Sequence, residues 1–157
     1  MAKPQPCVFI PSDVTKQTLA TSAMQGKHLL EPFKSAAAGS AINILEDHEL
    51  TDNQTEVHRH EADLWICLEG EVDFVVGGEL VEPWAKKLPD GSEDTRELKA
   101  NVDGIRGGTA HTLTAGDILF IPAGQPHVHT TKKTGRLYII KVPMPEIPLE
   151  DVPGWTH

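Results

Sequence analysis

The chain has 157 residues, which suits a single domain with a sizeable core. Its formal net charge of −9 argues against nucleic acid as a partner. No apolar run approaches the ~18 residues of a membrane span, and no apolar stretch at the amino terminus resembles a signal peptide. Cys7 and Cys67 are too far apart in sequence to suggest a disulfide framework, so we expect a cytoplasmic protein.

Frequent glycine and proline between short apolar runs are typical of an all-β domain. The first strand is expected at residues 7–10, and residues 15–30 fit either a short helix or a strand. A strand over 40–50 has Ile42, Ile44 and Glu46 on one face. Further strands are expected at 57–60, 64–68 and 71–76, followed by a tight turn at Gly77-Gly78.

Residues 83–108 interrupt this pattern with several turn signals and many charges. We expect an inserted long loop there, and two roles for it remain open. Trp84 pins the loop to the rest of the domain, or the loop covers the mouth of a pocket. Strands resume at 110–114, 117–121, 127–131 and 136–142, and the proline-containing residues 143–157 are expected to form an extended C-terminal arm on the surface or on a partner subunit.

Two stretches of sequence carry candidate metal ligands. His58 and His60 are two residues apart, and side chains two apart on a strand point to the same face. Imidazole is a common ligand of first-row transition metals, so this pair could bind one ion. His127 follows a separate predicted strand and could supply a third imidazole.

These stretches resemble the paired motifs of the cupin superfamily. The first cupin motif is H-x-H, three or four residues, Glu, six residues, Gly. His58 and His60 match it, and Asp63 takes the place of the glutamate, with six residues between it and Gly70 but only two between it and His60. The second motif is matched without a gap by the glycine, proline, glycine and histidine at Gly116, Pro122, Gly124 and His127, with Thr131 in place of its final asparagine.

The resemblance implies a small, single-domain metal-binding cupin spanning residues 1–157, with a core at about 40–142 and a jelly-roll β-barrel fold. It also implies a homodimer. If Asp63 points into the barrel, Leu64, Ile66 and Leu68 form an outward apolar row that a second subunit could cover.

The predicted metal ligands are His58, His60, His127 and Asp63, although a three-histidine site with water in the fourth position remains an alternative. Glu61 is expected to be a solvated turn residue. The expected cofactor is one divalent transition metal. Iron or manganese is the first choice, and nickel, cobalt or zinc are alternatives. His129 shares the inward face with His127 and is the candidate catalytic acid or base.

A fairly apolar substrate pocket is expected, formed by Trp65, Cys67, Phe74, Phe120 and Thr131. The leading hypothesis is a metal-dependent enzyme, an oxygenase or a lyase, acting on a small organic molecule. The alternative is a non-catalytic metal-dependent binding or sensing protein, because the cupin fold alone does not determine the reaction.

Overall fold

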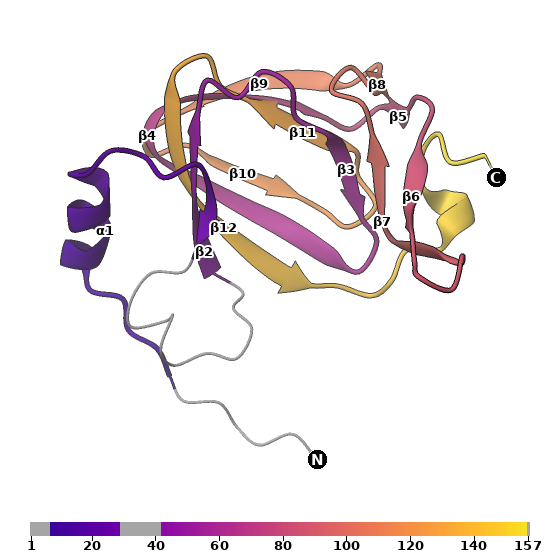
Figure 1. The fold of residues 1–157 in the computed structure, drawn as a ribbon, viewed down its shortest axis with the longest axis horizontal. Coiled ribbons are helices and arrows are strands. Elements are labelled where there is room, and N and C mark those ends of the chain that lie inside the picture. Colours follow the sequence, from indigo (N-terminus) through magenta and orange to yellow (C-terminus); the bar gives the residue numbers. More distant parts are fainter. Residues whose placement is uncertain (1–6, 29–41, 157) are drawn as a thin grey trace.

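The computed structural model describes residues 7–28 and 42–156. These form an antiparallel ten-stranded sheet folded into two layers, with a separate two-stranded ribbon and one short helix (Figure 1). The helix is α1 (Ser12–Leu19), and no helix of the described ranges is long and apolar enough to cross a membrane. The strands are β1 (Gly26–His28), β2 (Ile42–His48), β3 (Thr55–His58), β4 (Glu61–Val76), β5 (Glu79–Leu80), β6 (Trp84–Lys87), β7 (Glu93–Ala100), β8 (Ile105–Arg106), β9 (Thr109–Thr114), β10 (Ile118–Ile121), β11 (His127–Thr130) and β12 (Thr134–Pro143).

The long strand β4 belongs to both layers. Its first part pairs with β12 and β10 in sheet A, which has the order β1-β2-β12-β4-β10. Its second part pairs with β9 and β11 in sheet B, which continues through β3 and β7 to β6. Gly70 lies where β4 changes partners, with φ of +77°, and an added Cβ would come within 1.9 Å of the Thr134 carbonyl oxygen. Only glycine fits this bend, and the predicted all-β fold of jelly-roll type is confirmed.

The main core lies between the two layers. Trp65 and Phe74, both on β4, pack edge to face with ring centroids 5.3 Å apart. Burial of such large apolar side chains stabilises the fold by roughly 1.5–3 kcal/mol each. The other buried members are Leu45, Cys67, Val72, Leu113, Ile121, Leu137 and Ile139.

A second apolar cluster covers the outer face of sheet B. Val57 of β3 and Leu98 of β7 are fully buried there against Val152 and Trp155 of the C-terminal segment. This segment contains the 3-10 helix η1 (Leu149–Asp151) and lies beside β6 (Figure 1, yellow). The predicted arm therefore lies on the surface of its own chain.

The strand expected at residues 7–10 is absent, and residues 15–30 divide between α1 and β1, with 29–30 outside the described residues. Residues 40–41 of the next expected strand also lie outside them. The two strands expected at 64–68 and 71–76 are one continuous strand, because Gly70 bends β4 without ending it.

The inserted segment 83–108 is not an irregular loop, so that expectation was wrong. It contains β6 and β7, which extend sheet B, and β8, which pairs with β5. The charges of β7 suggested a loop, but they alternate with Leu98 and Ala100, which pack into the second cluster. Trp84 lies on β6 and is partly exposed.

Candidate metal centre

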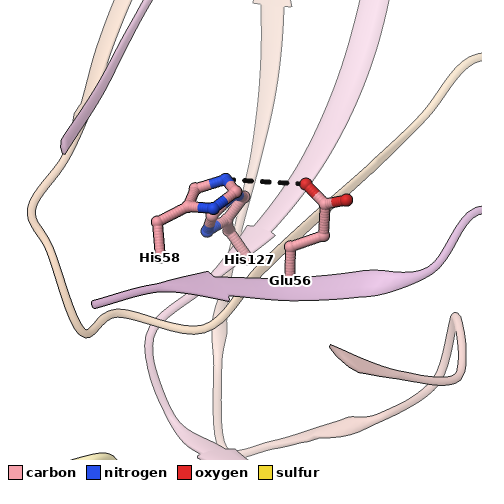
Figure 2. A group of neighbouring side chains, drawn as sticks. All are labelled: Glu56, His58 and His127. Carbon is pink, nitrogen blue, oxygen red and sulfur yellow. Dashed lines mark ion pairs between the residues drawn. The ribbon is translucent and has the colours of Figure 1, made fainter. Parts of the chain in front are cut away.

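Two imidazoles and two carboxylates converge between the two layers, with Asp63 on the part of β4 that belongs to sheet A and the other three residues on the inner face of sheet B. Glu56 and His58 extend from β3, and His127 lies beside them on the paired strand β11 (Figure 2). Nε2 of His58 lies 3.6 Å from Oε2 of Glu56 and 3.6 Å from Oδ2 of Asp63. Nε2 of His127 lies 3.5 Å from the same oxygen of Asp63. These residue types at these separations form a candidate metal centre.

Strand alternation and register explain this convergence. Glu56 and His58 are two residues apart on β3, so they share the inner face, whereas Val57 points to the second apolar cluster. Glu56 is directly opposite His127 in the β3–β11 pair. The backbone N–H of Gly124 donates to the carbonyl oxygen of His58 at 2.8 Å and so holds the turn before β11 against β3.

His60 does not join this cluster. β3 ends at His58, so the alternation that was expected to carry both histidines to one face stops before His60. His60 is exposed, and its carbonyl oxygen accepts a hydrogen bond from the backbone N–H of Met144. No metal-binding group among the described residues includes it.

The spacing of the first motif changes accordingly. With Glu56 and His58 as its first two candidate ligands, four residues separate His58 from Asp63, and six separate Asp63 from Gly70. Both intervals then equal those of the cupin motif, with a glutamate in place of its first histidine. The two-residue gap between His60 and Asp63 was the sequence signal for this register, and Glu56 was missed because it is not a histidine.

Hydrogen bonds fix which imidazole nitrogens carry a proton. Nδ1 of His127 lies 3.1 Å from the carbonyl oxygen of Gln125, which can only accept, so Nδ1 donates, and in the neutral ring Nε2 keeps its lone pair. Nε2 of His58 accepts a hydrogen bond from the Lys141 ammonium at 2.9 Å. Both Nε2 atoms are therefore in the form that binds a metal.

Two buried atoms of the cluster have no hydrogen-bond partner. They are Oδ2 of Asp63 and Nε2 of His127, both electron-pair donors. A buried polar atom without a partner is costly, and such atoms often mark a site for an ion or a water. The residues present therefore fit a bound cation.

The two carboxyl groups of the cluster have lowered pKa values. Burial alone would raise the pKa of Asp63, but the neighbouring His127 and His58 rings and the Lys141 ammonium hold it well below its usual range. Burial likewise opposes ionisation of Glu56, yet its hydrogen bond with Lys99 lowers its pKa. Both side chains are thus carboxylates at neutral pH, the form that binds metal ions.

Two lysines, which the sequence analysis did not anticipate, flank the centre. Lys99 pairs with Glu56 and Glu97, and Nζ of Lys141 lies 2.6 Å from Oδ1 of Asp63 and 3.2 Å from Oε1 of Glu61. Glu61 is therefore not a freely solvated turn residue. These four carboxylates carry −4 and the two ammonium groups +2, which leaves −2, the charge that one divalent cation would balance.

A cavity of about 250 Å³ adjoins the centre. His129 lies in its wall, with its ring centroid 5.3 Å from that of Trp65. Nε2 of His129 donates to Oδ2 of Asp47 at 3.0 Å. The lining residues are Leu45, Glu56, His58, Glu61, Trp65, Glu97, His129, Ile139 and Lys141.

The other predicted pocket residues lie elsewhere. Cys67 and Phe74 are buried in the main core, and Oγ1 of Thr131 donates to the carbonyl oxygen of Glu71. Phe120 points outward and is 51% exposed, because its neighbour Ile121 is the β10 residue that packs into the core. Of the five, Trp65 alone is among the described residues that line the cavity.

No protein-family model and no curated protein matches this chain. Among the solved structures, three distant matches are found. Drosophila melanogaster CENP-C bound to CAL1 has a TM-score of 0.44 and 12% identity, covering 73% of this chain and 72% of that chain. Peruvianin-I, a cysteine peptidase from Thevetia peruviana latex, has a TM-score of 0.42 and 14% identity, covering 99% and 90%.

The third is hydroquinone 1,2-dioxygenase from Sphingomonas sp. TTNP3, with 4-hydroxybenzoate bound. Its TM-score is 0.43 at 10% identity, covering 99% of this chain and 93% of that chain. Likenesses at this level carry no information about function, so the function has to be inferred from the centre itself.

Proposed function

We propose that this chain binds one divalent transition metal through His58, His127, Asp63 and Glu56. The observation that carries the proposal is the 3.5 Å approach of Asp63 Oδ2 to His127 Nε2, two buried electron-pair donors without a hydrogen-bond partner. Two such donors repel one another unless a proton or a cation lies between them. The excess of negative charge around them favours the cation.

The donor set favours a particular group of metals. Two histidines and a carboxylate with open positions are the ligands typical of non-haem iron(II) oxygenases, and carboxylates also suit manganese. Iron or manganese therefore remains the first choice, with nickel, cobalt or zinc as alternatives. The proposed set replaces the expected three histidines and one carboxylate, since Glu56 takes the place of His60.

The adjoining cavity favours an enzyme acting on a small, fairly apolar organic substrate. Leu45, Trp65 and Ile139 form the apolar part of its wall beside six polar or charged residues, and its volume limits the substrate to a small molecule. When bound, the metal would polarise a substrate oxygen or, if it is iron, pass electrons to O₂. Polarisation of a substrate oxygen would serve a lyase, and electron transfer to O₂ would serve an oxygenase.

His129 favours catalysis over simple binding. Its ring lies in the cavity wall beside Trp65, where it could exchange a proton with a bound substrate, and Asp47 holds its orientation. A non-catalytic metal-dependent binding or sensing protein is the alternative, because such a protein needs the pocket but no proton-transfer group.

The test begins with metal analysis of protein purified without added metal. We expect up to one equivalent of a transition metal, with any remainder of the site filled by added Mn²⁺ or Fe²⁺. The His58→Ala and His127→Ala variants should fold but lose this metal. A protein that neither carries nor takes up a transition metal would contradict the proposal.

An oxygen-uptake and product screen of the metal-loaded protein, with enolizable ketones and catechols, then separates the two alternatives. Turnover of any of these supports an enzyme. Tight binding of such compounds without O₂ consumption or product supports the sensing protein.

A further inference from the structure

Lys141 is held against the centre by the fold itself. On β12 it is directly opposite Asp63 of β4, and its side chain is only 17% exposed. Its Nζ lies 2.6 Å from Asp63 Oδ1, 2.9 Å from His58 Nε2 and 3.2 Å from Glu61 Oε1. An ammonium group has three N–H donors and no acceptor, so these three contacts use all of its donors.

Two of those three acceptors belong to the proposed ligand set. Nε2 of His58 has a single lone pair, which can accept a hydrogen bond from Lys141 or bind a metal, but cannot do both. The positive charge of Lys141 also lies where it partly neutralises Asp63. Metal binding by His58 therefore requires Lys141 to move away from that nitrogen.

We propose that Lys141 is an internal cation that competes with the metal for His58 and Asp63 and thereby sets the metal affinity of the centre. The proposal rests on the proposed function, because it assumes the same ligands. In the metal-free protein Lys141 stabilises the buried carboxylate, and a metal has to replace both its charge and its hydrogen bonds. Removal of Lys141 should therefore tighten metal binding.

Lys99 provides a matched comparison. It carries the same charge and pairs with Glu56 and Glu97 on another side of the centre. Its contact is with Oε1 of Glu56, whereas Oε2 is the oxygen that faces His58. Lys99 thus adds positive charge near the centre without occupying the histidine lone pair. A comparison of variants at the two lysines therefore distinguishes the blocking of a ligand atom from a general effect of positive charge on metal affinity.

The experiment is isothermal titration of the full-length protein with Co²⁺ or Mn²⁺ after removal of bound metal by a chelator. Lys141→Met keeps the length of the side chain and should tighten binding by roughly tenfold or more, since a buried charge contact no longer has to be broken. Lys99→Met should tighten it much less. The visible absorption of Co²⁺ checks that a histidine-containing site is filled.

Equal tightening in both variants would mean that charge alone matters, and unchanged or weaker binding in Lys141→Met would mean that Lys141 does not compete. Either result overturns the proposal. Because Lys141→Met leaves Asp63 with fewer partners, circular dichroism of the metal-free variant checks its fold. Lys141→Gln, which retains a hydrogen-bond donor without the charge, provides a second variant with the same expected direction.

The outcomes also separate this inference from the proposed function. If the natural protein binds metal and Lys141→Met binds it no more tightly, only the inference fails. If Lys141→Met binds metal and the natural protein does not, competition by Lys141 is supported and the proposed function of the natural chain fails. Absence of binding in both proteins overturns both.

Discussion

Nε2 of His129 lies 3.0 Å from Oδ2 of Asp47, in a contact that joins β11 of sheet B to β2 of sheet A. Asp47 is almost fully buried, and its other oxygen accepts a hydrogen bond from Nε2 of Gln25 at 2.7 Å. Asn53 donates to the backbone carbonyl of His129 at 3.0 Å. The imidazole is therefore held in one orientation in the cavity wall, and Asp47 acts on it as a positioning residue.

The first prediction concerns this pair. If the metal-loaded protein is an enzyme as proposed, His129→Ala should lower turnover by about 10²-fold, because it removes the group proposed to exchange a proton with the substrate, while metal content stays unchanged. Asp47→Asn should cause a smaller loss, since the imidazole remains but is less firmly oriented. Turnover measured beside metal content tests both, with Asp73→Asn on the surface as the control. Loss of metal from His129→Ala would instead indicate that His129 holds the metal ligands in place.

The second prediction tests the register of the first motif. His58→Ala should abolish stoichiometric metal binding, because it removes the proposed ligand at the middle of the cluster, whereas His60→Ala should leave it unchanged. The two variants remove the same type of side chain two positions apart. Metal titration of both decides between the pair Glu56 and His58 and the pair His58 and His60. Loss of metal in His60→Ala would restore the original expectation.

The third prediction concerns the carboxylates of the cluster. Asp63→Asn should weaken metal binding by roughly 10²-fold, since Asp63 is fully buried and has an oxygen directed at both histidines. Glu61→Gln should have a much smaller effect, because Glu61 is partly exposed and 3.9 Å from Nδ1 of His58. Equal losses of metal affinity in the two variants would argue against a ligand role for Asp63 that Glu61 does not share.

Much of this fold could be predicted because it depends on local sequence. The alternation along β4 correctly placed Trp65 and Cys67 inside and Leu64, Ile66 and Leu68 on the less buried face. The glycine and proline spacing of the second motif gave the position of β10 and β11. Such patterns depend on strand geometry, which repeats every two residues.

The parts of the centre that were missed depend on long-range pairing. Lys141 contacts Asp63 because β12 and β4 are in register across 78 positions of sequence, and no local pattern contains that register. Glu97 and Lys99 were also missed, because alternating charges on a strand usually indicate a solvated face. On β3 and β7 the charged face points inward and the apolar face is covered by the C-terminal segment.

The fourth prediction is a homodimer formed through the outer face of sheet A. Ile118 and Phe120 of β10 are 65% and 51% exposed, and they lie directly opposite Ile66 and Leu64 of β4. An apolar face of this kind favours association with a second copy. Light scattering at micromolar concentration should show a dimer, and Phe120→Lys should shift it to a monomer without loss of β structure. Trp84→Lys, on the other layer, is the control, and a monomeric natural protein would contradict the prediction.

The last prediction concerns the C-terminal segment and Arg59. Nε of this buried side chain donates to the carbonyl oxygen of Ile147 at 2.8 Å, and its guanidinium pairs with Glu146 at 2.9 Å. Arg59→Ala should lower the free energy of unfolding by about 1–3 kcal/mol, because it leaves partly buried acceptors unpaired and loosens the segment that covers Val57 and Leu98. Urea denaturation measures this loss. Arg96→Ala, which removes an exposed arginine paired with Asp94, should change stability little. If both variants lose the same stability, the segment is held by its apolar contacts alone, and Trp155→Ala should then cause the larger loss.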